Sequence, residues 1–194
     1  MNEIVESEVK MNVSAPVFNL VDVFGREVNL ESYRGSKVFI GFFRHAGCPF
    51  CNLRVHALMK YYTTNKFGSM KMVFFFESKE NTIKNSSLLS GVSPVPVISD
   101  HAKVWYNIYG IEDSIQKSSM SHLTTFIQTA VKAKMNNLPI HLMADGESFG
   151  TMPAEFLLDE NLVIRKMYYS KRLADRMDIE HIVDFCDTDH STLL

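Results

Sequence analysis

Two continuous apolar runs constrain the fold of this chain more than any other feature of its sequence. The first, VFIGFF, covers residues 38–43, and the second, MKMVFFF, covers residues 70–76. A strand with one face in water alternates apolar and polar residues, whereas an unbroken apolar run is typical of a strand covered on both faces. Helix-like segments alternate with strand-like segments in this half of the chain. The sequence therefore predicts an α/β fold with a central mixed β-sheet flanked by helices.

Weaker patterns predict the remaining elements. Residues 17–30 alternate around Gly25, which predicts an N-terminal β-hairpin with one apolar face made of Phe18, Leu20, Val28 and Leu30. Helices are expected over residues 51–62, within 79–90 and over 178–186, and strands within 93–99 and over 154–159 and 162–169. A helical insertion over residues 119–134 is expected to pack against the sheet through an apolar stripe of Met120, Leu123, Phe126, Ile127, Ala130 and Val131.

Size and composition favour one globular domain. The chain has 194 residues, of which 46% are hydrophobic, enough for a core without metals or disulfides. We expect a single domain over residues 1–194, with its core at about 15–186 and a loose tail at 187–194. The formal net charge of −2 gives no basic excess for nucleic acid or an anionic membrane. The acidic N-terminal segment has no signal-peptide core, so we expect a cytoplasmic protein whose three cysteines serve chemistry or packing.

A CxxC motif, GCPFC, lies between the first predicted core strand and the helix that follows it. Cys48 and Cys51 are therefore expected at a helix N-terminus, where the partial positive charge stabilises a thiolate. Their spacing lets the two sulfur atoms meet within one turn, so a reversible disulfide is accessible. Pro49 suits the first turn of a helix, and Arg44 and Arg54 add positive charge nearby.

Two other interpretations of the motif remain open. A structural zinc site commonly needs two separated ligand pairs, and here His45 and His56 lie near the only pair. The two cysteines could also be inert, because free cysteines are often simply buried. Burial as a packing residue is what we expect of Cys186 in the last helix. For His45 the expectation is a solvated or backbone-bonded side chain, with tuning of the thiolate pKa as the alternative.

Several segments together resemble one family. The opening APVFNLVDVFGREVNLESYRGSKVFIGFF, the CxxC loop, the segment PVPVISDHAKVWYNIYGI and the closing PAEFLLDENLVIRKMYYS are similar to the peroxiredoxin-like alkyl hydroperoxide reductase/thiol-specific antioxidant (redoxin) family of the thioredoxin superfamily. The resemblance covers about residues 15–185 and is weakest at 112–150. It implies a thioredoxin-like fold and a thiol-dependent oxidoreductase.

The active-site loop departs from the pattern of that family. Its members usually carry Pro-x-x-x-Thr-x-x-Cys around the cysteine that reacts with peroxide. If Cys51 takes the place of this cysteine, Cys48 stands at the Thr position and Arg44 at the Pro position. The resemblance also implies a later arginine that activates the thiolate, for which Arg172 and Arg176 are the candidates.

A proline near the end of the chain points toward thioredoxin-type reductases instead. The segment TMPAEFLLD resembles the one in which those proteins carry a cis-proline opposite the cysteines. We therefore expect a cis bond before Pro153 and a free Met152 backbone, beside which a substrate peptide could pair. The alternative is an ordinary trans proline at a strand entrance.

The resemblance implies a thiol–disulfide oxidoreductase whose catalytic residues are Cys48, Cys51, Pro153 and Arg44, with no cofactor and no metal. In one mechanism Cys48 attacks a disulfide and Cys51 resolves the mixed disulfide. In the other, Cys51 attacks a peroxide and Cys48 condenses with the sulfenic acid. Both need an external thiol reductant such as thioredoxin or glutathione. A homodimer is left open, and the competing function is a non-enzymatic protein-binding module with an inert CxxC.

Overall fold

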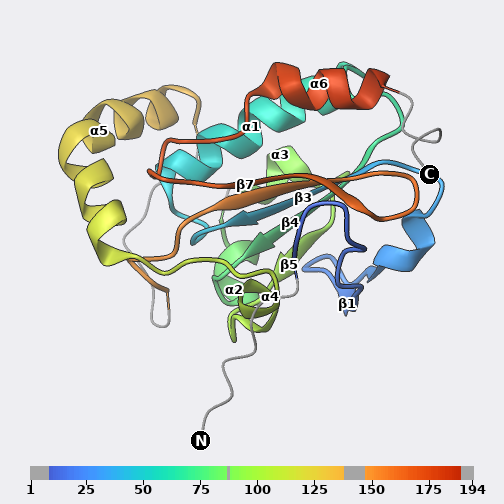
Figure 1. The fold of residues 1–194 in the computed structure, drawn as a ribbon. Helices are drawn as coiled ribbons and strands as arrows, with labels where there is room; N and C mark the ends of the chain where they lie inside the picture. Colours follow the sequence, from blue (N-terminus) through green and yellow to red (C-terminus); the bar gives the residue numbers. More distant parts are fainter. Residues whose placement is uncertain (1–8, 87, 138–146, 189–194) are drawn as a thin grey trace, which may run out of the picture.

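A five-stranded mixed sheet forms the centre of the protein (Figure 1). The computed structural model describes residues 9–86, 88–137 and 147–188, apart from the side chains of residues 90 and 120–127. The strand order is β5-β4-β3-β6-β7, and the strands are β3 (Val38–Phe43), β4 (Lys71–Phe76), β5 (Val97–Ser99), β6 (Ala154–Leu158) and β7 (Ile164–Tyr169). β3, β4 and β5 are parallel, whereas β6 is antiparallel to both of its neighbours. The predicted α/β fold with a mixed sheet is confirmed.

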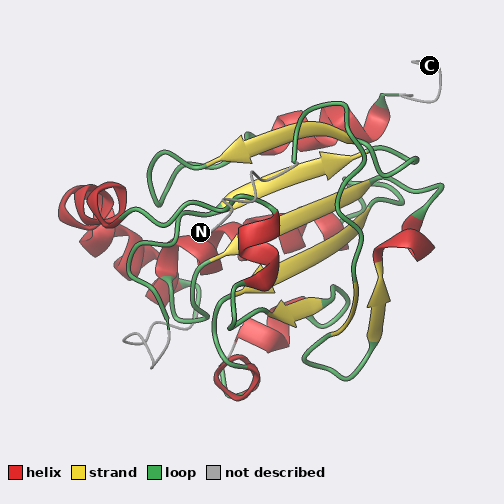
Figure 2. Ribbon diagram, turned by 60° about the horizontal axis from the view of Figure 1, so that its bottom comes forward, coloured by secondary structure: helices red, strands yellow, loops and turns green. Residues whose placement is uncertain are grey.

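Helices and a small hairpin cover the two faces of this sheet. The other elements are β1 (Asn19–Val21), β2 (Glu27–Asn29), the 3-10 helix η1 (Leu30–Tyr33), α1 (Pro49–Thr63), α2 (Glu80–Lys84), α3 (Leu88–Val92), α4 (Val104–Ile108), α5 (Ile115–Met135) and α6 (Ile179–Asp187). α1 and α6 lie over one face, and α4 lies over the other, which Figure 2 turns toward the viewer. β1 and β2 pair antiparallel with Leu20 opposite Val28, so the predicted N-terminal hairpin is confirmed.

The continuous apolar sequence of β3 explains its central position. All six of its residues are buried, because side chains from both sides of the strand enter a core. Phe39 and Phe43 pack with residues of α1 and α6, whereas Ile40 and Phe42 pack with Tyr106 of α4 and residues near the hairpin. The strand ends where the polypeptide enters the CxxC loop, so the sheet holds that loop at the carboxyl ends of the parallel strands.

α5 departs from the predicted packing. The helix begins at Ile115, where Ser114 accepts a hydrogen bond at its N-terminus, and it contacts α1 at the end of the sheet (Figure 1). Val131 is 55% exposed, so the prediction that it packs against the sheet is wrong, and Ala133 is buried instead. The shift of the buried face follows from packing onto a neighbouring helix rather than onto a flat sheet. The predicted stripe residues 120, 123, 126 and 127 lie outside the described side chains.

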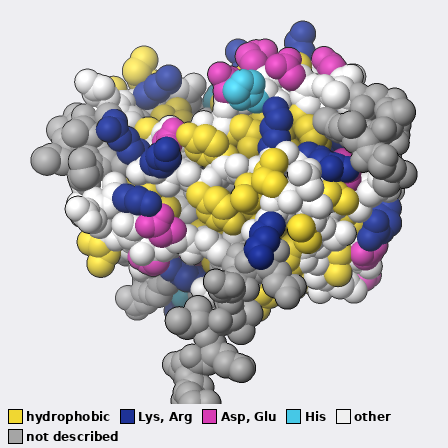
Figure 3. Space-filling model, in the orientation of Figure 1, with side chains coloured by type: hydrophobic (Ala, Val, Ile, Leu, Met, Phe, Trp, Pro, Cys, Tyr) yellow, Lys and Arg dark blue, Asp and Glu magenta, His cyan; other side chains and the backbone are white. Residues whose placement is uncertain are grey.

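β7 forms one edge of the sheet. Figure 3 shows apolar side chains across the middle of the molecular face seen in Figure 1, with Lys and Arg side chains around them. A homodimer through any such surface stays a prediction.

Within the described parts of the chain, no helix is long and apolar enough to cross a bilayer. Most of the tail that was expected to be loose, from residue 189 onward, lies outside the described residues.

Candidate active site

The CxxC motif forms the beginning of α1. Cys48 is the N-cap residue, and Pro49 occupies the first helical turn. Proline fits there because the backbone N–H that it lacks would have no hydrogen-bond partner within the helix. The carbonyl of Cys48 accepts a hydrogen bond from the Asn52 N–H at 3.0 Å, which closes the first turn. Asn52 also donates to the Ala46 carbonyl at 2.9 Å and fixes the loop that precedes the helix. The sequence therefore places both cysteines where the helix dipole favours negative charge.

The two sulfur atoms lie together and out of contact with water. Both cysteine side chains are 0% exposed, both are reduced, and a hydrogen bond links them. The backbone N–H of Arg44 donates to the Cys51 Sγ atom at 3.4 Å. Nη1 of Arg44 lies 3.7 Å from the Cys48 Sγ atom, and Nη2 of Arg176 lies 3.8 Å from the Cys51 Sγ atom. Arg44 thus contacts the sulfur atom of Cys48, and Arg176 contacts the sulfur atom of Cys51.

This arrangement separates the pKa values of the two thiols. Burial acts to raise the pKa of Cys48, but the hydrogen bond from Cys51 and the charges of Arg44 and Arg176 outweigh it and lower that pKa to about 6. Burial raises the pKa of Cys51 well above its ordinary value, and the hydrogen bond to Cys48 and its charge raise it further. The two shifts favour a single negative charge on the pair, on Cys48 rather than on Cys51.

A buried polar network holds the Arg44 side chain in place. Its Nη2 atom donates to the Phe149 carbonyl at 2.8 Å and lies 3.4 Å from the Ser148 carbonyl. The Ser148 N–H donates to Glu77 at 3.2 Å, and the Thr151 hydroxyl donates to the same carboxylate at 2.6 Å. Burial raises the pKa of Glu77, and the hydrogen bond from Thr151 opposes that rise. Glu77 thus holds the segment of residues 148–151, whose Ser148 and Phe149 carbonyls in turn hold the Arg44 side chain.

A second buried carboxylate organises the opposite side of the pair. Glu155 of β6 accepts two hydrogen bonds from Arg54, at 2.7 and 2.9 Å, and one from the Met177 N–H at 3.0 Å. Its carboxylate lies 3.9 Å from Nε of Arg176. Arg54 is therefore occupied by Glu155, and Arg176 supplies the positive charge that the sequence analysis assigned to Arg54. The fully buried Glu155 interrupts the otherwise apolar sequence of β6, and a lone carboxylate in such a run indicates a structural role.

Comparison with protein-family models matches residues 11–167 to the AhpC/TSA family. The chain belongs to the AhpC/TSA family. This match confirms the family resemblance inferred from the sequence. Members of the family are thiol-dependent peroxidases with a thioredoxin-like fold. The comparison with curated proteins gives no match.

Solved structures of peroxiredoxins share the fold of this AhpC/TSA chain. It is similar to the reduced 2-Cys peroxiredoxin of Plasmodium vivax, with 18% identity, a TM-score of 0.59 and coverage of 91% of this chain and 80% of the other. For the yeast mitochondrial 1-Cys peroxiredoxin the identity is 12%, the TM-score 0.61 and the coverage 92% and 75%. For the peroxidoxin BcpB of Mycobacterium tuberculosis the values are 11%, 0.64, 93% and 97%.

The site meets one expectation of the AhpC/TSA family and departs from another. Of the two candidates for the later arginine, Arg176 contacts Cys51, whereas Arg172 is exposed. The positions that usually hold Pro and Thr hold Arg44 and Cys48, which contact each other. A second thiol and a buried cation therefore stand at the two sequence positions where the family usually carries a threonine and a proline.

The predicted cis bond before Pro153 is wrong. The described residues contain no cis peptide bond, so Pro153 is trans, and it lies directly before β6, where its missing N–H breaks no sheet hydrogen bond. The Met152 N–H donates to the Glu112 carbonyl at 2.8 Å, and Met152 is 2% exposed. The chain itself thus occupies the backbone position at which a substrate peptide was expected to pair.

The remaining candidate residues lie around the site or away from it. His45 is buried, and its Nδ1 atom lies 3.6 Å from the Glu147 carboxylate, which contradicts a solvated side chain. His56 is exposed on α1. Cys186 packs against Met70, and burial raises its pKa to about 11, as expected of a packing residue. Among the described residues, no three His, Cys, Asp or Glu side chains gather as ligands for one metal.

Proposed function

We propose that the protein reduces peroxides with the Cys48–Cys51 pair and is regenerated by an external thiol. The observation that carries this proposal is the contact of two buried sulfur atoms with two guanidinium groups at the start of α1. A thiolate is the reactive form of cysteine, and this site favours one on Cys48. Membership of the AhpC/TSA family supports peroxide as the oxidant.

In the proposed cycle Cys48 reacts first. Its thiolate attacks one oxygen of the peroxide, the O–O bond breaks, and the other oxygen leaves as an alcohol or water after taking up a proton. Cys48 is then a sulfenic acid. The Cys51 thiol attacks that sulfur, water leaves, and the Cys48–Cys51 disulfide forms. Two electrons from an external thiol reductant restore the pair.

The charge distribution supports this order, and one contact favours the reverse order. Cys48 has the lowered pKa and Cys51 the raised one, which suits a nucleophile and a resolving thiol. However, Arg176 contacts Cys51 at the position of the peroxide-reacting cysteine in the family pattern. In that second version Cys51 forms the sulfenic acid and Cys48 resolves it.

Peroxides suit the site better than protein disulfides do. A protein substrate of a thioredoxin-type reductase pairs its backbone beside the cysteines, and the Met152 N–H is already bonded to the Glu112 carbonyl. A small oxidant needs no such pairing. We propose thioredoxin or glutathione as the reductant, because the yeast mitochondrial 1-Cys peroxiredoxin has its thiol resolved through these systems.

Stopped-flow kinetics of the reduced protein with hydrogen peroxide tests the proposal. The wild type should lose two thiols for each peroxide consumed. Cys48→Ser should lose the fast phase, whereas Cys51→Ser should keep it and accumulate a sulfenic acid that dimedone traps on Cys48. Cys186→Ser is the control and should match the wild type.

The same experiment separates the alternatives. A fast phase that survives in Cys48→Ser and disappears in Cys51→Ser would select the reverse order. A faster reaction with a small aromatic disulfide than with peroxide would make the protein a disulfide reductase. Thiols that react with neither oxidant would identify an inert CxxC in a binding module.

A further inference from the structure

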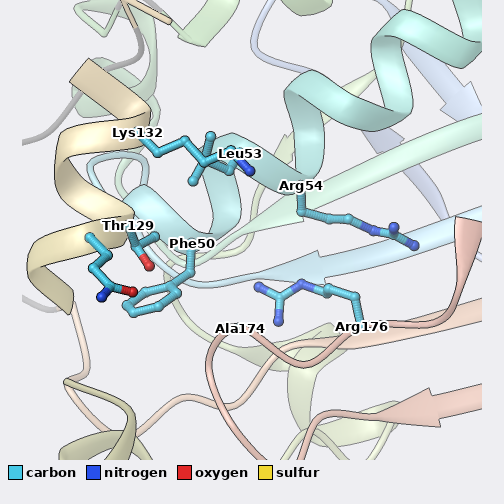
Figure 4. Close-up of a pocket in the computed structure, with 8 residues that line it drawn as sticks. Phe50, Leu53, Arg54, Thr129, Lys132, Ala174 and Arg176 are labelled. Atoms are coloured by element: carbon cyan, nitrogen blue, oxygen red, sulfur yellow. The ribbon is translucent and has the colours of Figure 1, made fainter. Parts of the chain in front are cut away.

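A cavity of about 420 Å³ lies at the N-terminal end of α1 (Figure 4). Three segments form it: the first turns of α1, the second half of α5 and the loop between β7 and α6. The described residues that line it are Phe50, Leu53, Arg54, Gln128, Thr129, Lys132, Ala174 and Arg176. Its volume falls within the range of ligand pockets that bury a small organic molecule.

The charges of the cavity wall are all positive among these described residues. Lys132, Arg54 and Arg176 contribute three cations, and no lining residue of the described set is acidic. Glu155 lies behind the wall and pairs closely with Arg54, at 2.7 Å, but only at 3.9 Å with Arg176. Lys132 forms no ion pair with a carboxylate of the described residues. Arg176 also faces the negative charge of the Cys48–Cys51 pair, so Lys132 is the lining cation that an anionic ligand would neutralise.

Apolar side chains form the remainder of the wall. Phe50 and Leu53 of α1 face α5, and Ala174 closes the cavity on the side of the β7–α6 loop (Figure 4). In the close-up, Lys132 extends from α5 toward Leu53, and Arg176 extends toward Phe50. A ligand that fits both kinds of wall carries an anionic group and a compact apolar body. A hydrophilic acid without an apolar body would leave Phe50 and Leu53 unused.

Arg176 links this cavity to the chemistry. Its guanidinium group lines the cavity and lies 3.8 Å from the Cys51 Sγ atom, which is itself hydrogen-bonded to Cys48. The Arg176 side chain therefore separates a molecule bound in the cavity from the redox pair and contacts both of them.

We propose that this cavity binds the carboxylate of a small organic hydroperoxide with an apolar body, and that Lys132 of α5 selects for that charge. The proposal rests on the proposed peroxidase function and adds its substrate class. From this cavity the peroxide group has to reach the pair past Arg176, and the reaction then proceeds as described above, with the organic part leaving as a hydroxy acid. Lys132 acts as a specificity-determining residue and takes no part in bond breaking.

Binding can be tested without turnover by using an unreactive acid. 4-Isopropylbenzoate has the carboxylate and the apolar body but no peroxide group. Isothermal titration calorimetry of the reduced protein at low salt should give saturable binding. The affinity should fall on the order of tenfold in Lys132→Gln, because a charged hydrogen bond is lost. Ala174→Phe, which fills the cavity and keeps every charge, should abolish binding. Lys134→Gln, an exposed lysine outside the cavity, should bind like the wild type.

Selectivity is tested with a matched pair of oxidants, cumene hydroperoxide and its para-carboxylated derivative. The wild type should favour the carboxylated compound in kcat/KM on the order of tenfold. Lys132→Gln should remove that preference, and Lys132→Glu should reverse it, whereas Lys134→Gln, outside the cavity, should keep both the preference and the rate with uncharged cumene hydroperoxide.

The two proposals fail in different ways. Absence of 4-isopropylbenzoate binding, or equal losses in Lys132→Gln and Lys134→Gln, would overturn the carboxylate site whatever the peroxidase activity. Binding that follows the expected pattern in a protein that consumes neither hydroperoxide would keep the site and overturn the peroxidase. An unchanged preference in Lys132→Glu would overturn the assigned role of Lys132.

Discussion

The guanidinium group of Arg44 lies against the sulfur of Cys48, with Nη1 and Sγ 3.7 Å apart and neither side chain exposed. Burial by itself disfavours a thiolate, so a charge of opposite sign at this distance decides whether the thiol ionises. The carbonyls of Ser148 and Phe149 hold the same guanidinium from its other end. Arg44 is therefore fixed in position before any substrate arrives.

We predict that Arg44→Gln raises the pKa of Cys48. Loss of the adjacent positive charge should move it upward from about 6 by roughly 1–3 units. Titration of the thiolate absorbance at 240 nm measures the shift, and circular dichroism checks the fold. The exposed Arg172→Gln is the matched control and should leave the titration unchanged. A wild-type titration curve for Arg44→Gln would show that Arg44 does not stabilise the thiolate.

The reactivity of the pair should follow a single ionisation in the acid range. Cys48 is a neutral thiol below its pKa of about 6 and a thiolate above it, so the rate with an uncharged alkylating reagent should rise through pH 6 and then level off. Cys51 has a raised pKa, so no second rise should occur below about pH 8.5, the ordinary value of a free cysteine. Cys48→Ser should lose the step near pH 6. If that variant keeps the step, another group titrates there.

The sequence predicts the sheet and the position of the pair well because both depend on local patterns. The run at 38–43 matches β3, and the helix expected from residue 51 begins at Pro49, next to Cys48. Long-range contacts were not predictable in the same way. Arg172 and Arg176 are equivalent in sequence, and only the course of the chain after β7 brings one of them to Cys51.

Two further differences have physical causes that short segments do not encode. The similarity of TMPAEFLLD to a cis-proline segment says nothing of the segment that lies beside it, and the hydrogen bond from the Met152 N–H to the Glu112 carbonyl occupies the backbone there. The importance of Glu155 and Glu77 depends on arginine and lysine side chains from other elements. The signal that could have indicated them is a carboxylate within an apolar run for Glu155 and directly after one for Glu77.

Removal of the Glu155 charge should destabilise the protein strongly. Glu155 is fully buried and the Arg54 side chain is 9% exposed, so Glu155→Gln leaves a buried cation without its partner, at a cost of about 3–5 kcal/mol in the free energy of unfolding. Urea unfolding measures this cost. The surface pair of Glu80 and Lys84, exposed by 54% and 46%, provides the control, and Glu80→Gln should cost less than about 1 kcal/mol. Equal costs for the two variants would contradict the structural role of Glu155.

Gly41 in the middle of β3 should not tolerate a methyl group. A Cβ atom there would lie 2.8 and 2.9 Å from ring atoms of Phe43, whose side chain is fully buried. Gly41→Ala should therefore lower the free energy of unfolding by about 1–3 kcal/mol. Gly91 in α3 has open space around its Cβ position, so Gly91→Ala should be neutral or stabilise by about 0.5–1 kcal/mol. Thermal and urea unfolding compare the two variants, and a harmless Gly41→Ala would mean that the aromatic rings adapt freely.

The position of Cys48 at the N-cap and of Cys51 within the first turn of one helix has a consequence for how the redox state can be recognised. Because the sulfur atoms are already neighbours, forming a bond between them requires little movement of the backbone. What disappears on oxidation is one anion, and two arginines are left facing a neutral disulfide. The oxidised and reduced proteins would thus differ mainly in the local electric field. A partner that discriminates between them would respond to the electrostatic potential around the pair rather than to a change in backbone shape.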